Sequence, residues 1–183
     1  MGTYGIIDIE ERPLDELLRS ARETLVVEAM GVLFGNISER RSTSTWHVES
    51  VHSTQLATRF PRSIVYDTDN IDRSKWSLVD DCLGEYHFHS ANRTCRDPVN
   101  WGRVLASYAD RLVLIDRVDP VEIIIGFRRV NLKRKLAKNP FLVSGYIDIG
   151  GFPYKIGIGG YYYNGRLRRA EIKAPKRIVR RIS

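Results

Sequence analysis

Residues 84–89 read Gly84-Glu85-Tyr86-His87-Phe88-His89. The segment has the character of a strand, in which side chains at i and i+2 share a face. His87 and His89 are therefore expected on one face, about 7 Å apart along the backbone. Two such imidazoles can converge on one metal ion, and imidazole nitrogen is a preferred ligand of zinc. The alternative is a pair of solvated or hydrogen-bonded histidines.

A single acid, Glu28, interrupts the apolar, strand-like run from residue 25 to residue 33. A buried carboxylate is costly unless it is paired or used in chemistry. Catalytic zinc sites use such a group, because a non-ligand carboxylate takes a proton from the water that fills the open position. Glu28 is therefore a candidate general base. The alternatives are a place on the exposed face of an edge strand or a pairing with an arginine.

Together the two segments resemble the JAMM/MPN (Mov34/MPN/PAD-type) family of zinc metallopeptidases. The family has Glu-x-x-Gly-x-Leu-x-Gly on an early strand, and later a glycine that two residues separate from His-x-His. The matching residues are Glu28, Gly31, Leu33 and Gly35 in the first motif and Gly84, His87 and His89 in the second. The resemblance covers roughly residues 10–130 and implies an α/β fold, a mixed curved β-sheet flanked by helices of the cytidine-deaminase-like type. It also implies a Zn²⁺ cofactor held by His87 and His89.

The family's third motif is Ser-x-x-Asp, whose serine helps to stabilise the tetrahedral intermediate and whose aspartate is a metal ligand. The same spacing falls here on Asp97-Pro98-Val99-Asn100. Asp is a good N-cap and Pro suits the first helical position, so this register puts Asn100 in the ligand position. A second register, Thr94 to Asp97, makes Asp97 the ligand. We favour Asp97, since a carboxylate binds zinc better than an amide carbonyl does; Asn100 is its competitor.

Composition fits one domain of 183 residues with a core, at 43% hydrophobic content. No apolar run approaches the ~20 residues of a membrane-spanning helix. The first residues lack the pattern of a signal peptide. The two cysteines, Cys82 and Cys95, do not form a disulfide framework. We therefore expect a cytoplasmic protein without a membrane partner.

The net charge of +7 is concentrated towards the C-terminus. Residues 128–138 contain six basic residues and no acid, and residues 166–181 contain eight with Glu171 as the one acid. Such a surface suggests an anionic partner, either nucleic acid or an acidic protein. The alternative is an ordinary solvated surface with a frayed tail.

The remaining patterns predict an amphipathic helix around Pro13–Ala21 and several strands, among them a strongly apolar strand from Val121 to Arg128. After Pro140, aromatic and β-branched runs are separated by Gly150-Gly151, Gly159-Gly160 and Asn164-Gly165, which indicates a small antiparallel meander. We expect residues 1–130 to form the JAMM/MPN-like domain and residues 131–183 a basic, β-rich extension packed on it.

The resemblance implies a zinc-dependent hydrolase of peptide or isopeptide bonds, with a protein substrate such as a ubiquitin-like conjugate. Glu28 would then activate the water and later protonate the leaving amine. One alternative is a catalytically degenerate MPN-type scaffold that binds protein or nucleic acid through its basic C-terminal half. Another is a metal-dependent enzyme that acts on a small amide.

Overall fold

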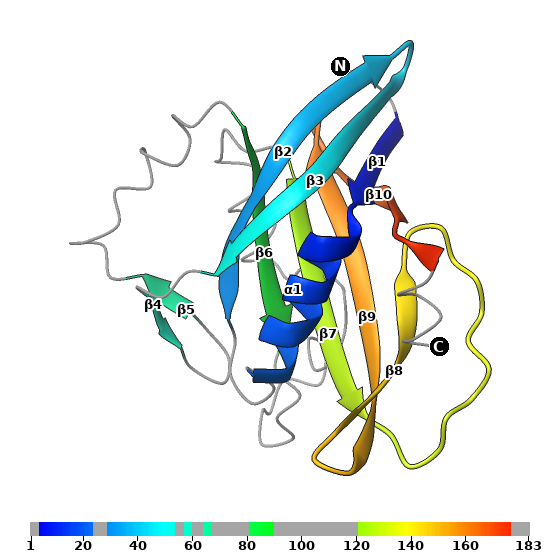
Figure 1. The fold of residues 1–183 in the computed structure, drawn as a ribbon. Coiled ribbons are helices and arrows are strands. Elements are labelled where there is room, and N and C mark those ends of the chain that lie inside the picture. The colour runs from blue at the N-terminus through cyan, green and yellow to red at the C-terminus, as the bar shows by residue number, and fades with distance from the viewer. Residues whose placement is uncertain are drawn as a thin grey trace.

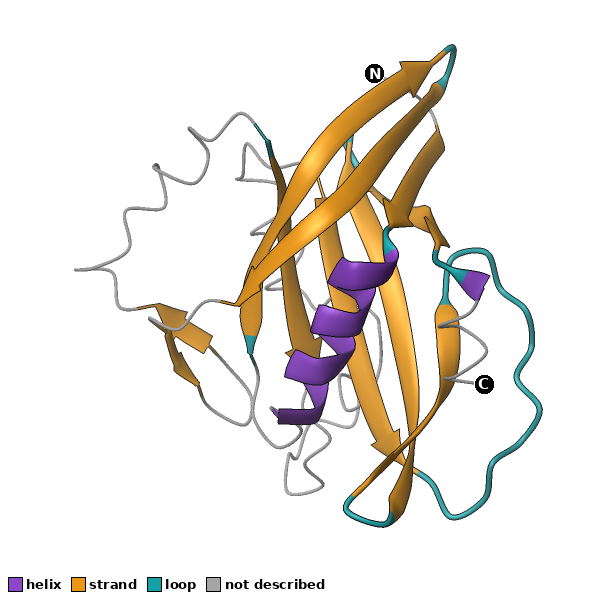
Figure 2. Cartoon of the chain, in the orientation of Figure 1, coloured by secondary structure: helices purple, strands orange, loops and turns teal. Residues whose placement is uncertain are grey.

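The computed structural model describes residues 4–23, 29–53, 57–59, 64–66, 81–89 and 121–176. In chain order the elements are β1 (Tyr4–Ile9), α1 (Glu11–Glu23), β2 (Met30–Arg40), β3 (Thr43–Ser53), β4 (Ala57–Arg59), β5 (Ile64–Tyr66), β6 (Cys82–His89), β7 (Val121–Arg129), β8 (Val143–Ile149), β9 (Phe152–Tyr163) and β10 (Leu167–Lys173). Strands account for 66% of the described residues (Figure 2). Within those residues α1 is the one long helix.

The main sheet has the strand order β10-β1-β3-β2-β6-β7-β9-β8 (Figure 1). β9 pairs with β7 on one side, and its last residues also pair with β10. That second pairing joins the two ends of the series, so the strands from β10 round to β9 close into a seven-stranded barrel. β8 lies outside the ring, paired with β9. β1 runs parallel to β3 and β10, and β6 runs parallel to β7.

α1 supplies one part of the core. Its apolar residues recur at helical spacing, and all of them are buried: Pro13, Leu14, Leu17, Leu18 and Ala21. They form one cluster with inward-facing side chains of the barrel strands, among them Ile7, Trp46 and Phe88. Figure 1 shows α1 lying across the curved sheet. The predicted amphipathic helix is confirmed.

Two motif glycines allow neighbouring strands to approach closely around β6. A Cβ on Gly31 would lie 2.2 Å from the His52 carbonyl oxygen and 2.6 Å from the Tyr86 ring. A Cβ on Gly84 would lie 1.9 Å from the Val121 carbonyl oxygen, and Gly84 has a φ of +145°, which side chains disfavour. Both positions therefore exclude any larger residue on steric grounds.

The predicted α/β fold, a mixed curved sheet flanked by helices, is wrong. The described chain is mostly β and closes into a barrel. The physical reason lies in strand pairings between the two ends of the chain, which the sequence analysis did not predict. β1 and β10 pair with each other in parallel, and β10 also pairs with β9, so the sheet returns on itself.

The segment after Pro140 forms three successive antiparallel strands, β8, β9 and β10. The predicted Asn164-Gly165 hairpin is confirmed, because Tyr163 pairs with Leu167 across that turn. Gly159-Gly160, expected to interrupt a strand, instead lies within β9. A Cβ on Gly160 would lie 2.5 Å from Ile7 Cδ1, so this glycine makes room for the β1 side chain.

Among the helices of the described ranges, none has the length and apolar character needed to cross a membrane.

Candidate metal site

The two predicted imidazoles come together on β6. His87 Nε2 lies 3.0 Å from His89 Nε2, and the ring centroids are 4.9 Å apart. β6 is a central strand between β2 and β7. Tyr86 and Phe88 alternate with the histidines and are buried in the main core, so the imidazoles occupy the opposite face of the sheet. His89 is 4% exposed.

A third side chain, Glu122 on β7, completes the arrangement. Its Oε1 lies 2.8 Å from His87 Nδ1. Glu122 is 5% exposed, and its Oε2 is buried without a hydrogen-bond partner in the structure as described. The sequence analysis missed this residue. The signal that singled out Glu28 was present here too, since Glu122 is the lone acid in the apolar run from Val121 to Phe127.

The contact with Glu122 determines what His87 can do. An ionised carboxylate only accepts hydrogen bonds, so Nδ1 of His87 is the donor. In the neutral imidazole, Nε2 then carries a lone pair, which is the form that binds a metal. Ligating histidines commonly donate their other ring N–H to a carboxylate in this way. The contact therefore favours the His87 tautomer in which Nε2 carries the lone pair.

The spacing of the two Nε2 atoms also fits zinc. Two nitrogens on a tetrahedral zinc ion, each about 2.0–2.1 Å from the metal, lie about 3.3 Å apart. The observed 3.0 Å is close to that value. Without a metal, the same contact is a hydrogen bond in which His89 Nε2 donates to His87 Nε2.

The other predicted site residues, Glu28, Asp97 and Asn100, lie outside the described residues, so their roles stay predictions. Ala29, which follows Glu28 in sequence, accepts a hydrogen bond from the backbone N–H of Phe88 at 2.8 Å. This bond holds the start of the β2 segment beside the residue between the two histidines. In the described part of the chain, no three His, Cys, Asp or Glu side chains are grouped to hold a metal.

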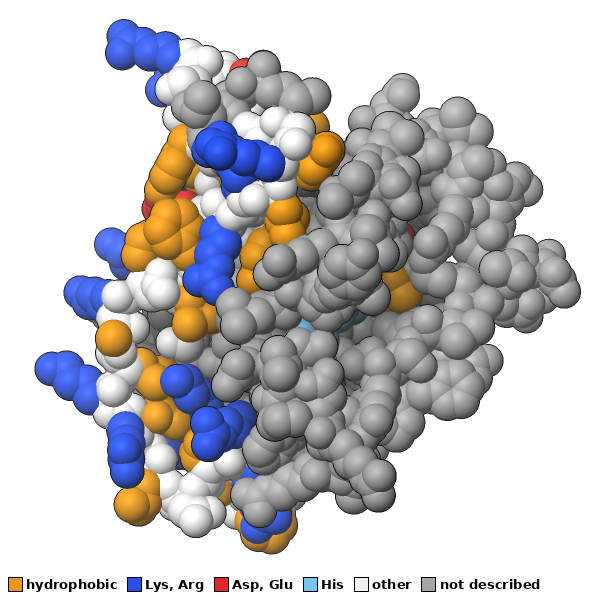
Figure 3. Space-filling view, turned by 180° about the vertical axis from the view of Figure 1, so that it is seen from behind, with side chains coloured by type: hydrophobic (Ala, Val, Ile, Leu, Met, Phe, Trp, Pro, Cys, Tyr) orange, Lys and Arg blue, Asp and Glu red, His pale blue; other side chains and the backbone are white. Residues whose placement is uncertain are grey.

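A second feature of the molecule is a basic surface. Along residues 123–176, Lys and Arg far outnumber acids, and the acids are Asp148 and Glu171. Each of these acids has a partner: Lys133 Nζ lies 3.0 Å from Asp148, and the Tyr4 hydroxyl donates to Glu171 at 2.7 Å. Figure 3 shows Lys and Arg side chains spread down one side of this face of the molecule. The exposed members are Arg128, Arg129, Lys133, Arg134, Lys135, Lys138, Arg166, Arg169, Lys173 and Lys176.

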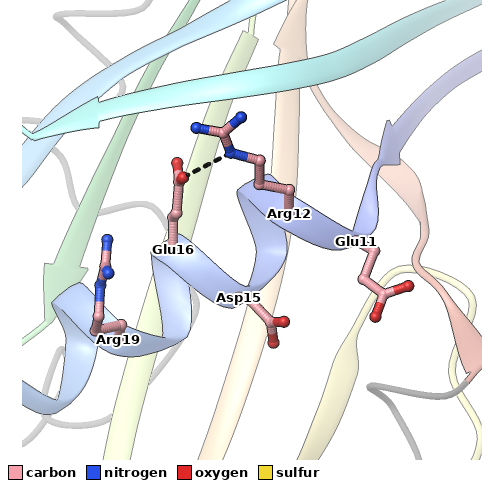
Figure 4. A pocket seen from close by; sticks show the side chains of 5 residues that line it. All are labelled: Glu11, Arg12, Asp15, Glu16 and Arg19. Atoms are coloured by element: carbon pink, nitrogen blue, oxygen red, sulfur yellow. Dashed lines mark hydrogen bonds and ion pairs between the residues drawn. The ribbon is translucent and has the colours of Figure 1, made fainter.

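The outer side of α1 carries a shallow hollow lined by charges of both signs: Glu11, Arg12, Asp15, Glu16 and Arg19 (Figure 4). Arg12 Nε and Glu16 Oε1 form an ion pair of 3.1 Å at helical spacing i, i+4. The lining comes from this one helix face and includes neither histidine. We interpret this hollow as part of a solvated helix surface.

No protein-family model matches the chain, and no curated protein matches it. Among solved structures, the chain is similar to protein DSY2949 from Desulfitobacterium hafniense, known from a solution structure. The TM-score is 0.52 at 19% identity, with 92% of each chain covered. It is also aligned with AF2198, a JAB1/MPN domain protein from Archaeoglobus fulgidus, with a TM-score of 0.38 at 14% identity, covering 95% of this chain and 100% of that one. The first likeness concerns the fold alone, and the second is too weak to carry an inference.

Proposed function

We propose that this chain binds a zinc ion through His87 and His89 and hydrolyses peptide or isopeptide bonds. The observation that carries the proposal is the convergence of two Nε2 atoms, 3.0 Å apart, with a buried carboxylate behind one of the rings. Two solvated histidines would not need that carboxylate. The sequence motif around Glu28 adds the general base that such a hydrolase requires.

Each residue has a distinct part in this proposal. A zinc ion bound there supplies Lewis-acid polarisation and makes water acidic near neutral pH. His87 and His89 hold the ion as neutral imidazoles. Glu28 takes a proton from water and passes it to the leaving amine. Asp97, or Asn100 in its place, is the third ligand. The substrate class is a protein amide, of which a ubiquitin-like conjugate is one example.

Replacing Glu28 by Gln tests the catalytic part. An amide side chain cannot accept the proton, so hydrolysis should fall by ~10²–10⁴-fold. Zinc content and the thermal unfolding midpoint should remain those of the wild type, because Glu28 is not proposed as a ligand. The substrates are a panel of peptide and ubiquitin-like isopeptide amides. Equal cleavage by wild type and Glu28→Gln would show that Glu28 is not the base, and no cleavage of any amide would favour a non-catalytic role.

A second candidate function is favoured by the basic surface. Residues 123–176 carry ten exposed Lys and Arg residues but two acids, Asp148 and Glu171, and both acids already have partners. Part of this surface is an ordered loop: the Tyr146 hydroxyl donates to the Arg134 carbonyl and accepts from the Arg134 N–H, both at 2.8 Å. Such a spread of exposed cations suits a phosphate backbone. We propose nucleic acid as the anionic partner.

Salt-dependent binding to a labelled oligonucleotide tests this second function. Converting Arg134, Lys135 and Lys138 to Gln should lower the slope of log affinity against log salt concentration by about 2–3, at roughly 0.7–0.9 per phosphate contact. The control variant converts Arg12 and Arg19 on α1, which should leave the slope unchanged. Equal slopes in all three proteins would reject the loop as the contact. Binding of an acidic protein but no oligonucleotide would reject nucleic acid as the partner.

A further inference from the structure

Glu122 is the one buried acid among the described residues. It lies on β7, a strand whose other residues from Val121 to Phe127 are apolar or glycine and are all buried. Burying a carboxylate there is costly unless it is paired. Among the described residues, its partner is Nδ1 of His87, at 2.8 Å.

The fold itself does not explain this carboxylate. Buried ion pairs contribute little net stability compared with apolar residues of similar size, since desolvation offsets the attraction. An aliphatic side chain would suit the strand, which continues through Ile123, Ile124 and Ile125. Moreover, one oxygen of Glu122 stays buried and unpaired in the described structure, which adds to the cost. A role beyond packing accounts better for the residue.

We infer that Glu122 is a positioning residue for the zinc site, and this inference rests on the proposed function. It accepts a hydrogen bond from Nδ1–H of His87, which holds the proton on that nitrogen. His87 Nε2 then keeps its lone pair and faces Nε2 of His89, 3.0 Å away. Without the carboxylate, this acceptor for Nδ1–H is lost, so a larger share of His87 should carry its proton on Nε2, where it blocks metal binding.

The tautomer of His87 tests the inference without any metal. In ¹⁵N NMR of metal-free wild type, His87 should carry its proton on Nδ1. Glu122→Met removes the acceptor but keeps an apolar side chain of similar length, so the Nε2–H form should appear. Glu122→Gln retains a neutral acceptor and should give an intermediate result. It also preserves the test if Glu122→Met does not fold.

Zinc affinity, measured by competition with a chromogenic chelator, is the second readout. Loss of an outer-shell partner typically weakens binding ~10–100-fold, so we expect that range for Glu122→Met and a smaller loss for Glu122→Gln. The matched control is Glu85→Gln, because Glu85 is the register partner of Glu122 on the same face of the sheet. It removes the same charge and should change affinity less than threefold, a bound well below the outer-shell range.

The outcomes separate this inference from the proposed function. Wild-type His87 protonated on Nε2 in the metal-free state would overturn the inference, and so would a Glu122→Met variant that binds zinc like wild type. A wild type that holds His87 as Nδ1–H yet binds no zinc would contradict the proposed function instead. Equal losses of zinc affinity in Glu85→Gln and Glu122→Met would show that the affinity depends on negative charge near the site in general. That result would reject the positioning role of Glu122.

Discussion

Replacing Gly31 by Ala should destabilise the protein through a steric conflict that can be read from the structure. The new Cβ would lie 2.2 Å from the His52 carbonyl oxygen, about 1.2 Å short of ordinary contact at 3.4 Å. The ring of Tyr86, 2.6 Å away, closes the other side. Because one obstacle is backbone and the other is a fully buried ring, neither can yield cheaply. Such overpacking costs about 1–3 kcal/mol.

For a chain of this length, 1 kcal/mol shifts the melting temperature by roughly 2–4 °C. Gly31→Ala should therefore melt about 2–12 °C below wild type in circular dichroism. It should also bind zinc less tightly, because displacing Tyr86 moves the strand that carries His87. The control is Gly151→Ala, where nothing lies within 4 Å of the new Cβ and the cost is the positive φ of +78°, about 1 kcal/mol. Gly31→Ala melting within 1 °C of wild type would refute the steric reasoning.

Three further predictions concern stability and the third ligand. Leu17 is fully buried, so Leu17→Ala should lower the free energy of unfolding by about 2–5 kcal/mol in urea titration. The hydrogen bond from Tyr4 to Glu171, together with burial and the charge of that carboxylate, raises the pKa of Tyr4 above its usual 10.0. Because the pKa of Tyr4 is higher in the folded protein than in the unfolded chain, this interaction contributes its full stability below pH 10, and the contribution is lost as the pH rises through the folded-state pKa. The difference in unfolding free energy between wild type and Tyr4→Phe should therefore narrow above pH 10. Asp97→Asn should weaken zinc binding by at least ~10-fold while Asn100→Ala changes it little, and the reverse pattern in chelator competition would assign the ligand to Asn100.

Local patterns in the sequence predicted the elements with strong periodicity or turn chemistry. α1 was visible in the spacing of its leucines, and β7 in the run from Val121 to Phe127. The hairpin at Asn164-Gly165 followed from the turn residues alone. Each of these signals depends on residues within a few positions of one another, which is why they could be read without the fold.

The closure of the barrel could not be read in this way. It depends on β1 pairing with β10, for example Ile6 with Glu171, across most of the length of the chain. β10 has the sequence LRRAEIK, in which only Ala170 and Ile172 are buried. The charged residues around them hide the alternation of buried and exposed positions that would mark a strand. No local pattern specifies a partner so far away. The sequence therefore offered nothing that contradicted the α/β prediction drawn from the resemblance.

The residues of the candidate site also differ in whether local sequence patterns could place them. His87 and His89 could be paired from sequence because a strand places i and i+2 on one face. Glu122 could not be joined to them, since its contact arises from the parallel register of β6 and β7, which pairs Glu85 with Glu122. A lone acid in an apolar strand nevertheless indicates a candidate site residue. This criterion selected Glu28, and it selects Glu122 equally.

The zinc content of purified protein tests the central claim most directly. The chain has four histidines, which provide a matched comparison: His87→Ala/His89→Ala removes the proposed ligands, and His47→Ala/His52→Ala removes the other two imidazoles. After gel filtration, elemental analysis should find about one zinc per chain in wild type and in the His47/His52 variant, and almost none in the His87/His89 variant. Near-zero zinc in wild type, or equal zinc in all three proteins, would contradict a metal site at His87 and His89.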